Sequence, residues 1–136
     1  MGKDLKITFM HQKEIENLSN LEPFERYEYF IKKIADFEVL FSIKSSEGNF
    51  AISETDDKYM LPLWSHEEFA KQNLNAGWES FQVYKISLEE LETDIFSFIS
   101  ENNYLINVFP LNNKTGFVVN LEEFKRDLEE ELEKIQ

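Results

Sequence analysis

Residues 60–71 read Met-Leu-Pro-Leu-Trp-Ser-His-Glu-Glu-Phe-Ala-Lys, and this stretch indicates the architecture of the chain. Its first half is apolar and ends at Trp64, as a β-strand would. Ser65 and Glu68 then match the Ser-x-x-Glu pattern of a helix capping box. Pro62 cannot donate a hydrogen bond to a neighbouring strand, so we expect this strand at a sheet edge, or kinked there. The stretch therefore predicts a strand followed directly by a capped helix.

The same transition recurs twice further along the chain. Ser87 with Glu90 repeats the capping pattern, and Asn120 with Glu123 is a weaker form of it. Each pair follows a run rich in Val, Ile, Phe, Leu or Tyr, as buried strands are. Strands and capped helices in this order predict an α+β fold. We expect an antiparallel or mixed sheet of about five or six strands, with helices packed on it.

No repeat, low-complexity tract or Pro/Gly-rich linker divides the chain, so residues 1–136 are expected to form a single domain. Within it, residues 1–22 are an N-terminal helical extension and residues 23–136 are the α+β core. We predict helices over 8–21 and 23–37 and after Ser65, Ser87 and Asn120, and strands over 39–43, 50–52, 59–64, 81–86, 104–109 and 117–119. The strands over 39–43 and 50–52 are expected to pair as a hairpin, and the strand over 104–109 to lie near the centre of the sheet.

Two of the predicted helices carry clear apolar stripes. The stripes face the core because their residues recur at helical spacing. They consist of Leu88, Leu91, Ile95 and either Phe98 or Ile99 in the helix after Ser87, and of Leu121, Phe124, Leu128, Leu132 and Ile135 in the last helix.

Composition excludes several classes of protein. Hydrophobic residues make up 42% of the chain and aromatic residues 15%, which is too much for a disordered chain. The absence of Cys excludes disulfides, thiolate metal sites and thiol nucleophiles. No stretch has the pattern of a signal peptide, and none approaches the ~20 apolar residues of a membrane span. We therefore expect a cytoplasmic protein with no membrane partner.

The chain is strongly acidic, with 14 basic and 27 acidic residues and a net charge of −13. Nucleic-acid binding requires a basic face, and the sequence indicates none. An acidic surface instead steers a protein toward a basic partner. The alternative is that the acidic residues serve only to keep the protein soluble.

No residue pattern indicates reaction chemistry. His66 lies at a helix start, and a metal site would need further donors at helical or strand spacing, which His11 does not provide. Carboxylate pairs such as Glu89-Glu90 fall at helix starts or on solvent-facing positions, where they complement the helix dipole. Ser65 and Ser87 are assigned to helix caps, and nucleotide and calcium motifs are missing. We therefore expect no catalytic residue, no cofactor and no metal.

The two tryptophans and the acidic last helix are the candidates for partner binding. Both Trp64 and Trp78 are assigned to the core, with the alternative that Trp78, following Asn75-Ala76-Gly77 in a loop, anchors a partner. The acidic outer face of the last helix would form the electrostatic rim of such a contact. The candidate partner-binding residues are Trp64, His66, Glu67, Trp78, Glu129, Glu130 and Glu133.

Five segments, in this order, resemble a bacterial family catalogued as domain of unknown function 2750. LPLWSHEEF is the most specific of them, since a proline and a tryptophan next to a capped helix seldom coincide by chance. The segments are RYEYFIKKIAD (26–36), LPLWSHEEFA (61–70), ISLEEL (86–91), NVFP (107–110) and GFVVNLEEF (116–124). The segment between residues 43 and 60 departs from the family, which is richer in Gly and Asp there. The resemblance implies a small bacterial cytosolic protein, similar in size and acidity to immunity proteins that neutralise toxins, and it supplies no catalytic residues.

The leading hypothesis is a non-enzymatic protein-binding module of the immunity type, which buries a basic toxin surface against its own acidic surface. A second hypothesis is a regulatory or adaptor module without a toxin partner, whose acidity serves only solubility. A third is a small hydrolase, which would need a pocket with converging polar groups. The oligomeric state and the identity of the partner stay open.

Overall fold

The computed structural model describes residues 12–75, 77–111 and 114–135 of the chain. In this part, six strands form a two-stranded ribbon and a four-stranded sheet. The ribbon is β1–β4, and the sheet has the order β2-β3-β5-β6, in which β3 and β5 are parallel and the other neighbours antiparallel. This mixed arrangement confirms the predicted α+β class. The strands are β1 (Val39–Ser45), β2 (Ser53–Thr55), β3 (Lys58–Leu63), β4 (Phe81–Ser87), β5 (Leu105–Val108) and β6 (Phe117–Val119).

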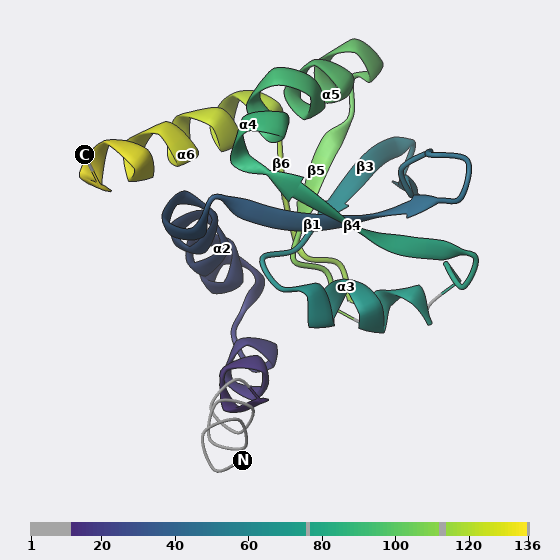
Figure 1. Ribbon diagram of the computed structural model, residues 1–136, viewed down its shortest axis with the longest axis horizontal. Helices are drawn as coiled ribbons and strands as arrows, with labels where there is room; N and C mark the ends of the chain where they lie inside the picture. The colour runs from purple at the N-terminus through teal and green to yellow at the C-terminus, as the bar shows by residue number, and fades with distance from the viewer. Residues whose placement is uncertain (1–11, 76, 112–113, 136) are drawn as a thin grey trace.

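The helices gather on two sides of the strands (Figure 1). Helices α2 and α6 pack against each other, and α3 lies on the side of the β1–β4 ribbon opposite to α4, α5 and α6. Residues 12–19, before α2, are also helical, which confirms the predicted helix over 8–21 except that it ends two residues early; residues 8–11 lie outside the described part. The helices are α2 (Pro23–Phe37), α3 (Glu67–Leu74), α4 (Leu88–Glu90), the π-helical turn η1 (Leu91–Ile95), α5 (Phe96–Asn102) and α6 (Leu121–Ile135).

The two faces of the four-stranded sheet differ in chemistry. Strand side chains alternate between faces, so Leu61 with Ile106 and Leu63 with Val108 share one face, and all four are fully buried. Phe117 of β6 shares this face and packs its ring 4.8 Å from that of Tyr27 in α2. The other face carries Ser53, Met60, Pro62 and Asn107. We call the face with Leu61 and Ile106 the helix-covered face and the face with Pro62 and Asn107 the open face.

Trp64 joins the ribbon to the sheet. Its backbone exchanges two hydrogen bonds with Phe41 of β1, at 2.8 and 2.9 Å. The predicted edge position of β3 is wrong, because β3 lies between β2 and β5. Strand β2 pairs only as far as Met60, however, and the Pro62 carbonyl accepts a hydrogen bond of 2.7 Å from the Ser42 hydroxyl. The proline therefore sits where β2 has already ended, and its missing N–H removes no bond of the β2–β3 ladder.

The predicted hairpin between residues 39–43 and 50–52 is confirmed in part, as a short turn back of the chain at the end of β1. Strand β1 pairs along its whole length with β4, from Val39↔Ser87 to Ser45↔Phe81. On its other edge, the end of β1 is hydrogen-bonded to the segment that follows it. The Ser45 N–H donates to the Asn49 carbonyl at 2.8 Å and the Ala51 N–H to the Ile43 carbonyl at 3.0 Å, with a bridge between Lys44 and Phe50. The hairpin is therefore shorter than predicted, and residues 51–52 do not form a strand.

Two of the three predicted helix caps are confirmed. The backbone N–H of Glu90 donates to the Ser87 hydroxyl at 3.0 Å, and that of Glu123 donates to Asn120 Oδ1 at 2.8 Å. The capping box at Ser65 is wrong, because α3 begins at Glu67 and its N-cap residue is His66.

The two apolar stripes are confirmed except at their ends. In η1 the backbone N–H of Phe96 donates to the Leu91 carbonyl, five residues back. This wider turn buries Ile99 and leaves Phe98 half-buried, which settles the choice between them. The last residue of α6, Ile135, is 55% exposed, contrary to the prediction that it faces inward.

Candidate functional site

Two of the predicted partner-binding residues lie in the interior. Trp64 is fully buried, and its indole N–H donates to the Pro110 carbonyl at 2.8 Å. His66 is 5% exposed. Neither side chain therefore offers surface to a partner in this structure, and the core position predicted for Trp64 is confirmed.

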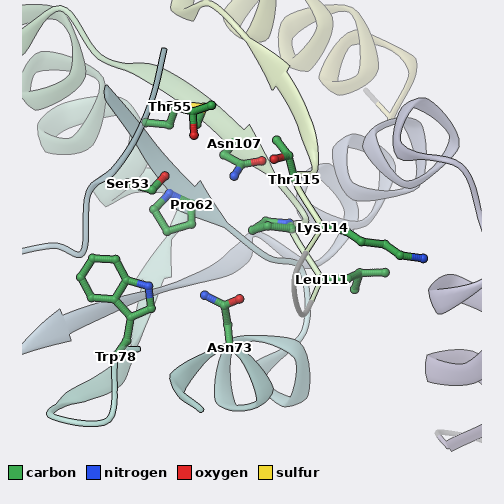
Figure 2. Close-up of a pocket in the computed structure, with 11 residues that line it drawn as sticks. Ser53, Thr55, Pro62, Asn73, Trp78, Asn107, Leu111, Lys114 and Thr115 are labelled. Atoms are coloured by element: carbon green, nitrogen blue, oxygen red, sulfur yellow. The ribbon is translucent and has the colours of Figure 1, made fainter. Parts of the chain in front are cut away.

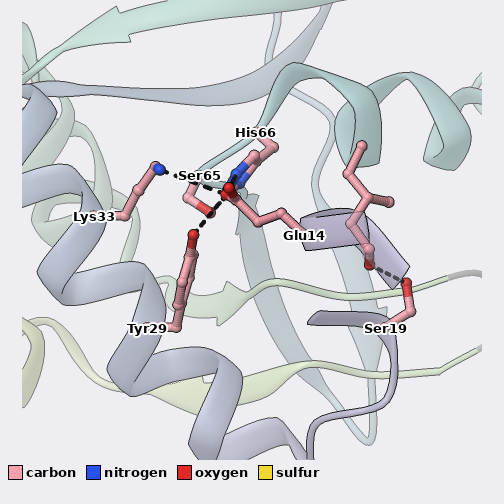
Figure 3. A network of polar contacts seen from close by, with 7 residues as sticks. Glu14, Ser19, Tyr29, Lys33, Ser65 and His66 are labelled. Carbon is pink, nitrogen blue, oxygen red and sulfur yellow. Dashed lines mark hydrogen bonds and ion pairs between the residues drawn. The ribbon is translucent and has the colours of Figure 1, made fainter. Parts of the chain in front are cut away.

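His66 belongs to a polar network that ties three segments together (Figure 3). Its Nδ1 lies 2.8 Å from the hydroxyl oxygen of Ser65, and its Nε2 lies 2.6 Å from Oε1 of Glu14. The same carboxylate oxygen accepts a hydrogen bond of 2.6 Å from the Tyr29 hydroxyl and lies 3.5 Å from the Lys33 ammonium. We call these five residues the His66 network. It connects the helical residues 12–19 with α2 and with the start of α3.

The protonation state of the network follows from its geometry. A carboxylate only accepts hydrogen bonds, so Nε2 of His66 carries the proton that faces Glu14. Burial lowers the pKa of His66, so the imidazole is neutral and its Nδ1 accepts from Ser65. Burial would raise the pKa of Glu14, but the bonds from Tyr29 and His66 and the charge of Lys33 outweigh it and hold this pKa at about 2.

The order Ser65, His66, Glu14 is that of a nucleophile, a base and an orienting acid. Nucleophilic catalysis also requires a hydroxyl that a substrate can reach. Ser65 and His66 are both buried, and the hollow beside the network is lined by Lys13, Asn17, Leu18 and Leu21 together with Glu14 and Tyr29. The geometry therefore fits a structural role, in which the network holds residues 12–19 against the core.

Trp78 lies at a pocket on the open face of the sheet (Figure 2). The pocket has a volume of about 260 Å³, and we call it the sheet-face pocket. Trp78 is half-buried at its margin, next to Asn73 of α3, with Ser53, Thr55 and Asn107 on the opposite side. The Trp78 indole N–H forms no hydrogen bond within the described part of the chain. The alternative prediction for Trp78, a half-exposed position in a loop, fits this placement.

The acidic candidates do not adjoin Trp78. Glu129, Glu130 and Glu133 are exposed on α6, which lies across the molecule from α3 (Figure 1). Glu67 is exposed on α3 and pairs with Lys71 at 3.1 Å. The expected combination of a Trp78 anchor with an α6 rim is therefore not one surface.

A second partly exposed surface was not predicted as a site. Five aromatic rings, each in contact with the next, run from β4 to β3 past the end of α5. Their centroids are 5.7 Å apart for Tyr84 and Phe50, 5.5 Å for Phe50 and Phe98, 5.5 Å for Phe98 and Tyr104, and 6.4 Å for Tyr104 and Tyr59. We call these five residues the aromatic row. Tyr59 at its end is 49% exposed, and the other four are half-buried.

Acidic residues border the aromatic row. A hollow of about 450 Å³ beside Phe50, Phe98 and Tyr104 is also lined by Glu90 and Asp94. A neighbouring hollow of about 720 Å³ is lined by Tyr59 and Tyr104 with Asp57 and Glu122. The Lys44 ammonium lies 3.7 Å from the centroid of Tyr84 and 4.5 Å from that of Phe50, and the Tyr84 hydroxyl donates to Glu90 at 2.5 Å.

The described residues contain no group of three or more His, Asp or Glu side chains placed to hold a metal ion. Nor is any helix in this part of the chain long and apolar enough to cross a membrane.

The model of a family described as "Protein of unknown function (DUF2750)" matches residues 27–128. No curated protein matches the chain. Among solved structures, Tic22 from Plasmodium falciparum is similar over 61% of this chain and 48% of its own length, with 11% sequence identity and a TM-score of 0.41. The chain thus spans about half the length of that neighbour, and a likeness at this level supports no statement about function.

Proposed function

The chain belongs to the DUF2750 family of proteins of unknown function, and we propose that it is a non-enzymatic protein-binding module with a basic partner. The observation that carries the proposal is the aromatic row with its acidic border. Of the partner classes, a basic toxin domain fits best, which makes this protein an inhibitor of the immunity type that acts in a bacterial cytoplasm.

The aromatic row has the chemistry of an interface centre. Energetically dominant interface residues are enriched in large amphipathic side chains such as Tyr and Trp. Contacts between neighbouring rings already restrict the side chains of the row. Binding a partner there would therefore cost little additional side-chain entropy.

The charges around the row favour a basic partner. Asp57, Glu90, Asp94 and Glu122 line the two hollows, against Lys44 and Lys58. Lys44 itself demonstrates that an ammonium group is held over these rings, since cations are attracted to aromatic faces. Basic side chains of a partner would occupy equivalent positions over Phe98 and Tyr104, and the net charge of −13 would accelerate their approach.

A selection from displayed random peptides tests the proposal. We expect the selected peptides to be enriched in Lys or Arg together with aromatic or aliphatic residues. Asp94→Lys should weaken their binding about tenfold or more, since it places a cation in the hollow. Glu129→Lys is the matched control, because it makes the same change in net charge on the outer face of α6, away from the row.

A second pair of variants tests the rings. Tyr59→Ala removes an exposed ring of the row and should weaken the same peptides, whereas Phe37→Ala removes an exposed ring at the end of α2 and should not. Peptides without basic residues, or equal losses in Asp94→Lys and Glu129→Lys, would contradict the proposal. Equal losses would favour the alternative in which acidity acts only through net charge.

A further inference from the structure

We propose that the sheet-face pocket binds an uncharged, hydroxyl-rich small molecule, namely a single neutral saccharide unit. The pocket lies on the open face of the sheet and involves none of the five residues of the aromatic row. The proposal is therefore independent of the proposed protein partner.

Two side chains of the pocket have a polar group without a hydrogen bond to the described residues, and for Ser53 this group is a buried atom. Asn107 is 6% exposed, and its Oδ1 accepts a hydrogen bond of 2.9 Å from the Gly116 N–H. Its Nδ2 has no hydrogen bond to any described residue. The hydroxyl oxygen of Ser53 is also buried and has no partner in the described part of the chain. Because buried polar atoms are nearly always hydrogen-bonded, the Ser53 hydroxyl indicates a polar ligand, and Nδ2 of Asn107 offers such a ligand a donor in the same pocket.

The hydrogen bond from Gly116 fixes the orientation of the Asn107 side-chain amide. A Cβ atom at Gly116 would lie 2.1 Å from the Val108 carbonyl oxygen, so the close approach of this backbone requires glycine. The Gly116 N–H then fixes Oδ1, which leaves Nδ2 directed elsewhere. Asn107 lies opposite Pro62 in the β3–β5 pairing, which places it on the face that the pocket covers. A site built on strands in this way is rigid before the ligand arrives.

The charge of the pocket points to an uncharged ligand. Among the described residues, the lining contains no acidic side chain that would hold a cation. Its one described basic residue, Lys114, extends away from Trp78, Asn73 and Asn107 (Figure 2). The net charge of −13 also opposes the approach of an anion.

The remaining walls match the two kinds of surface that a saccharide offers. Amide and hydroxyl groups of Asn73, Asn107 and Ser53 can both donate to and accept from sugar hydroxyls. Met60, Pro62 and the Trp78 ring offer apolar contact to its C–H groups. The volume of about 260 Å³ lies near the lower end of the range for ligand pockets, which suits one sugar unit.

Saturation-transfer NMR with the full chain tests the proposal, using D-glucose, D-galactose, D-mannose and N-acetyl-D-glucosamine as probes. We expect at least one of them to bind, and its charged analogues (the uronate and the 2-amino sugar) to bind at least about fivefold more weakly. Binding should also change the fluorescence of Trp78, and this change should vanish in Trp78→Phe.

Two variants separate a ligand site from a water-filled hollow. Ser53→Ala removes an unpartnered hydroxyl, so we expect unchanged folding stability with affinity reduced about fivefold or more. Asn107→Asp keeps the acceptor for Gly116 but loses the donor and should bind at least about tenfold more weakly. Ser97→Ala on the exposed side of α5 is the control and should bind as the unaltered protein does.

Three results would overturn the proposal: no binding of any neutral sugar, equal binding of charged analogues, or full affinity in Ser53→Ala. Asp94→Lys, which disrupts the aromatic row, should leave sugar binding unchanged. Failure of this proposal and failure of the proposed protein partner are therefore distinguishable.

Discussion

The His66 network and the sheet-face pocket are two polar regions at the same strand, β3, with opposite outcomes. At the end of the strand, Glu14, Ser65 and His66 pair with one another and connect two segments of the chain. On its open face, Asn107 and Ser53 have polar atoms without partners among the described residues. Polar side chains in the first region stabilise the fold, and those in the second remain available to a ligand. The difference teaches that pairing, rather than burial or residue type, separates a structural polar group from a candidate binding group.

The largest expected difference in folding stability is between Trp64, which precedes Ser65 of the His66 network, and Trp78, which lines the sheet-face pocket. Trp64→Ala should lower the free energy of unfolding by about 3–5 kcal/mol, because it empties a fully buried site and leaves the Pro110 carbonyl unpaired. Trp78→Ala should lower it by only about 1 kcal/mol, because this side chain is half-buried and its N–H pairs with nothing in the described chain. Urea denaturation of both variants measures the difference.

The comparison would fail if the two variants lost similar stability, since Trp78 would then be a core residue like Trp64. Trp64→Phe serves as a control for the loss of the hydrogen bond alone, because it keeps most of the apolar volume. We expect it to lie between Trp64→Ala and the unaltered protein.

Local patterns predicted much of the fold. The caps at Ser87 and Asn120 involve residues three apart, so the sequence contains the whole interaction. The pairing of β1 with β4 could not be predicted in this way, because the partners Val39 and Ser87 are 48 residues apart. The short contact of β1 with residues 49–51 was predictable, because these residues follow β1 directly after a turn.

The second difference between the two regions is in the pH dependence of folding stability, which we expect to arise from the His66 network and not from the pocket. Glu14 has a pKa of about 2 instead of the usual 4.5, so its contribution is complete above pH 4.5 and is lost as the pH falls toward 2. The pKa of His66 is lowered from its usual 6.5, so its contribution is complete above pH 6.5 and declines below that value. The free energy of unfolding should therefore fall in both steps as the solution is acidified.

Glu14→Gln should remove the lower step and His66→Gln the upper one, as followed by urea denaturation at a series of pH values. The lowering of the Glu14 pKa from 4.5 to about 2 would correspond to about 3.4 kcal/mol of folding stability. Because 35% of the Glu14 side chain is exposed, solvent screening reduces the expected step to about 1 kcal/mol. Asn107→Leu, in the pocket, should leave both steps in place. A profile unchanged by Glu14→Gln would mean that residues 12–19 are not held by this carboxylate.

The candidate sites were less predictable than the fold. Glu14 and His66 are 52 residues apart, and no spacing rule connects them. Asn107 stands alone in an apolar run, where it has the pattern of an ordinary strand residue. The residues of the aromatic row lie on different elements, and each fits a core position by itself. Trp78 was identified because a loop after Asn75-Ala76-Gly77 is a local feature.

The smallest contrast uses the same substitution in both regions. Ser65→Ala removes a hydroxyl that donates to Nδ1 of His66, and the loss of this hydrogen bond should lower the free energy of unfolding by about 1 kcal/mol. Ser53→Ala removes a hydroxyl that has no partner in the described structure, so the free energy of unfolding should stay within about 0.5 kcal/mol of the original or rise. Paired urea titrations resolve a difference of this size. If Ser53→Ala were the more destabilising change, its hydroxyl would already be paired within the protein, and the sheet-face pocket would be a second closed network instead of an open one.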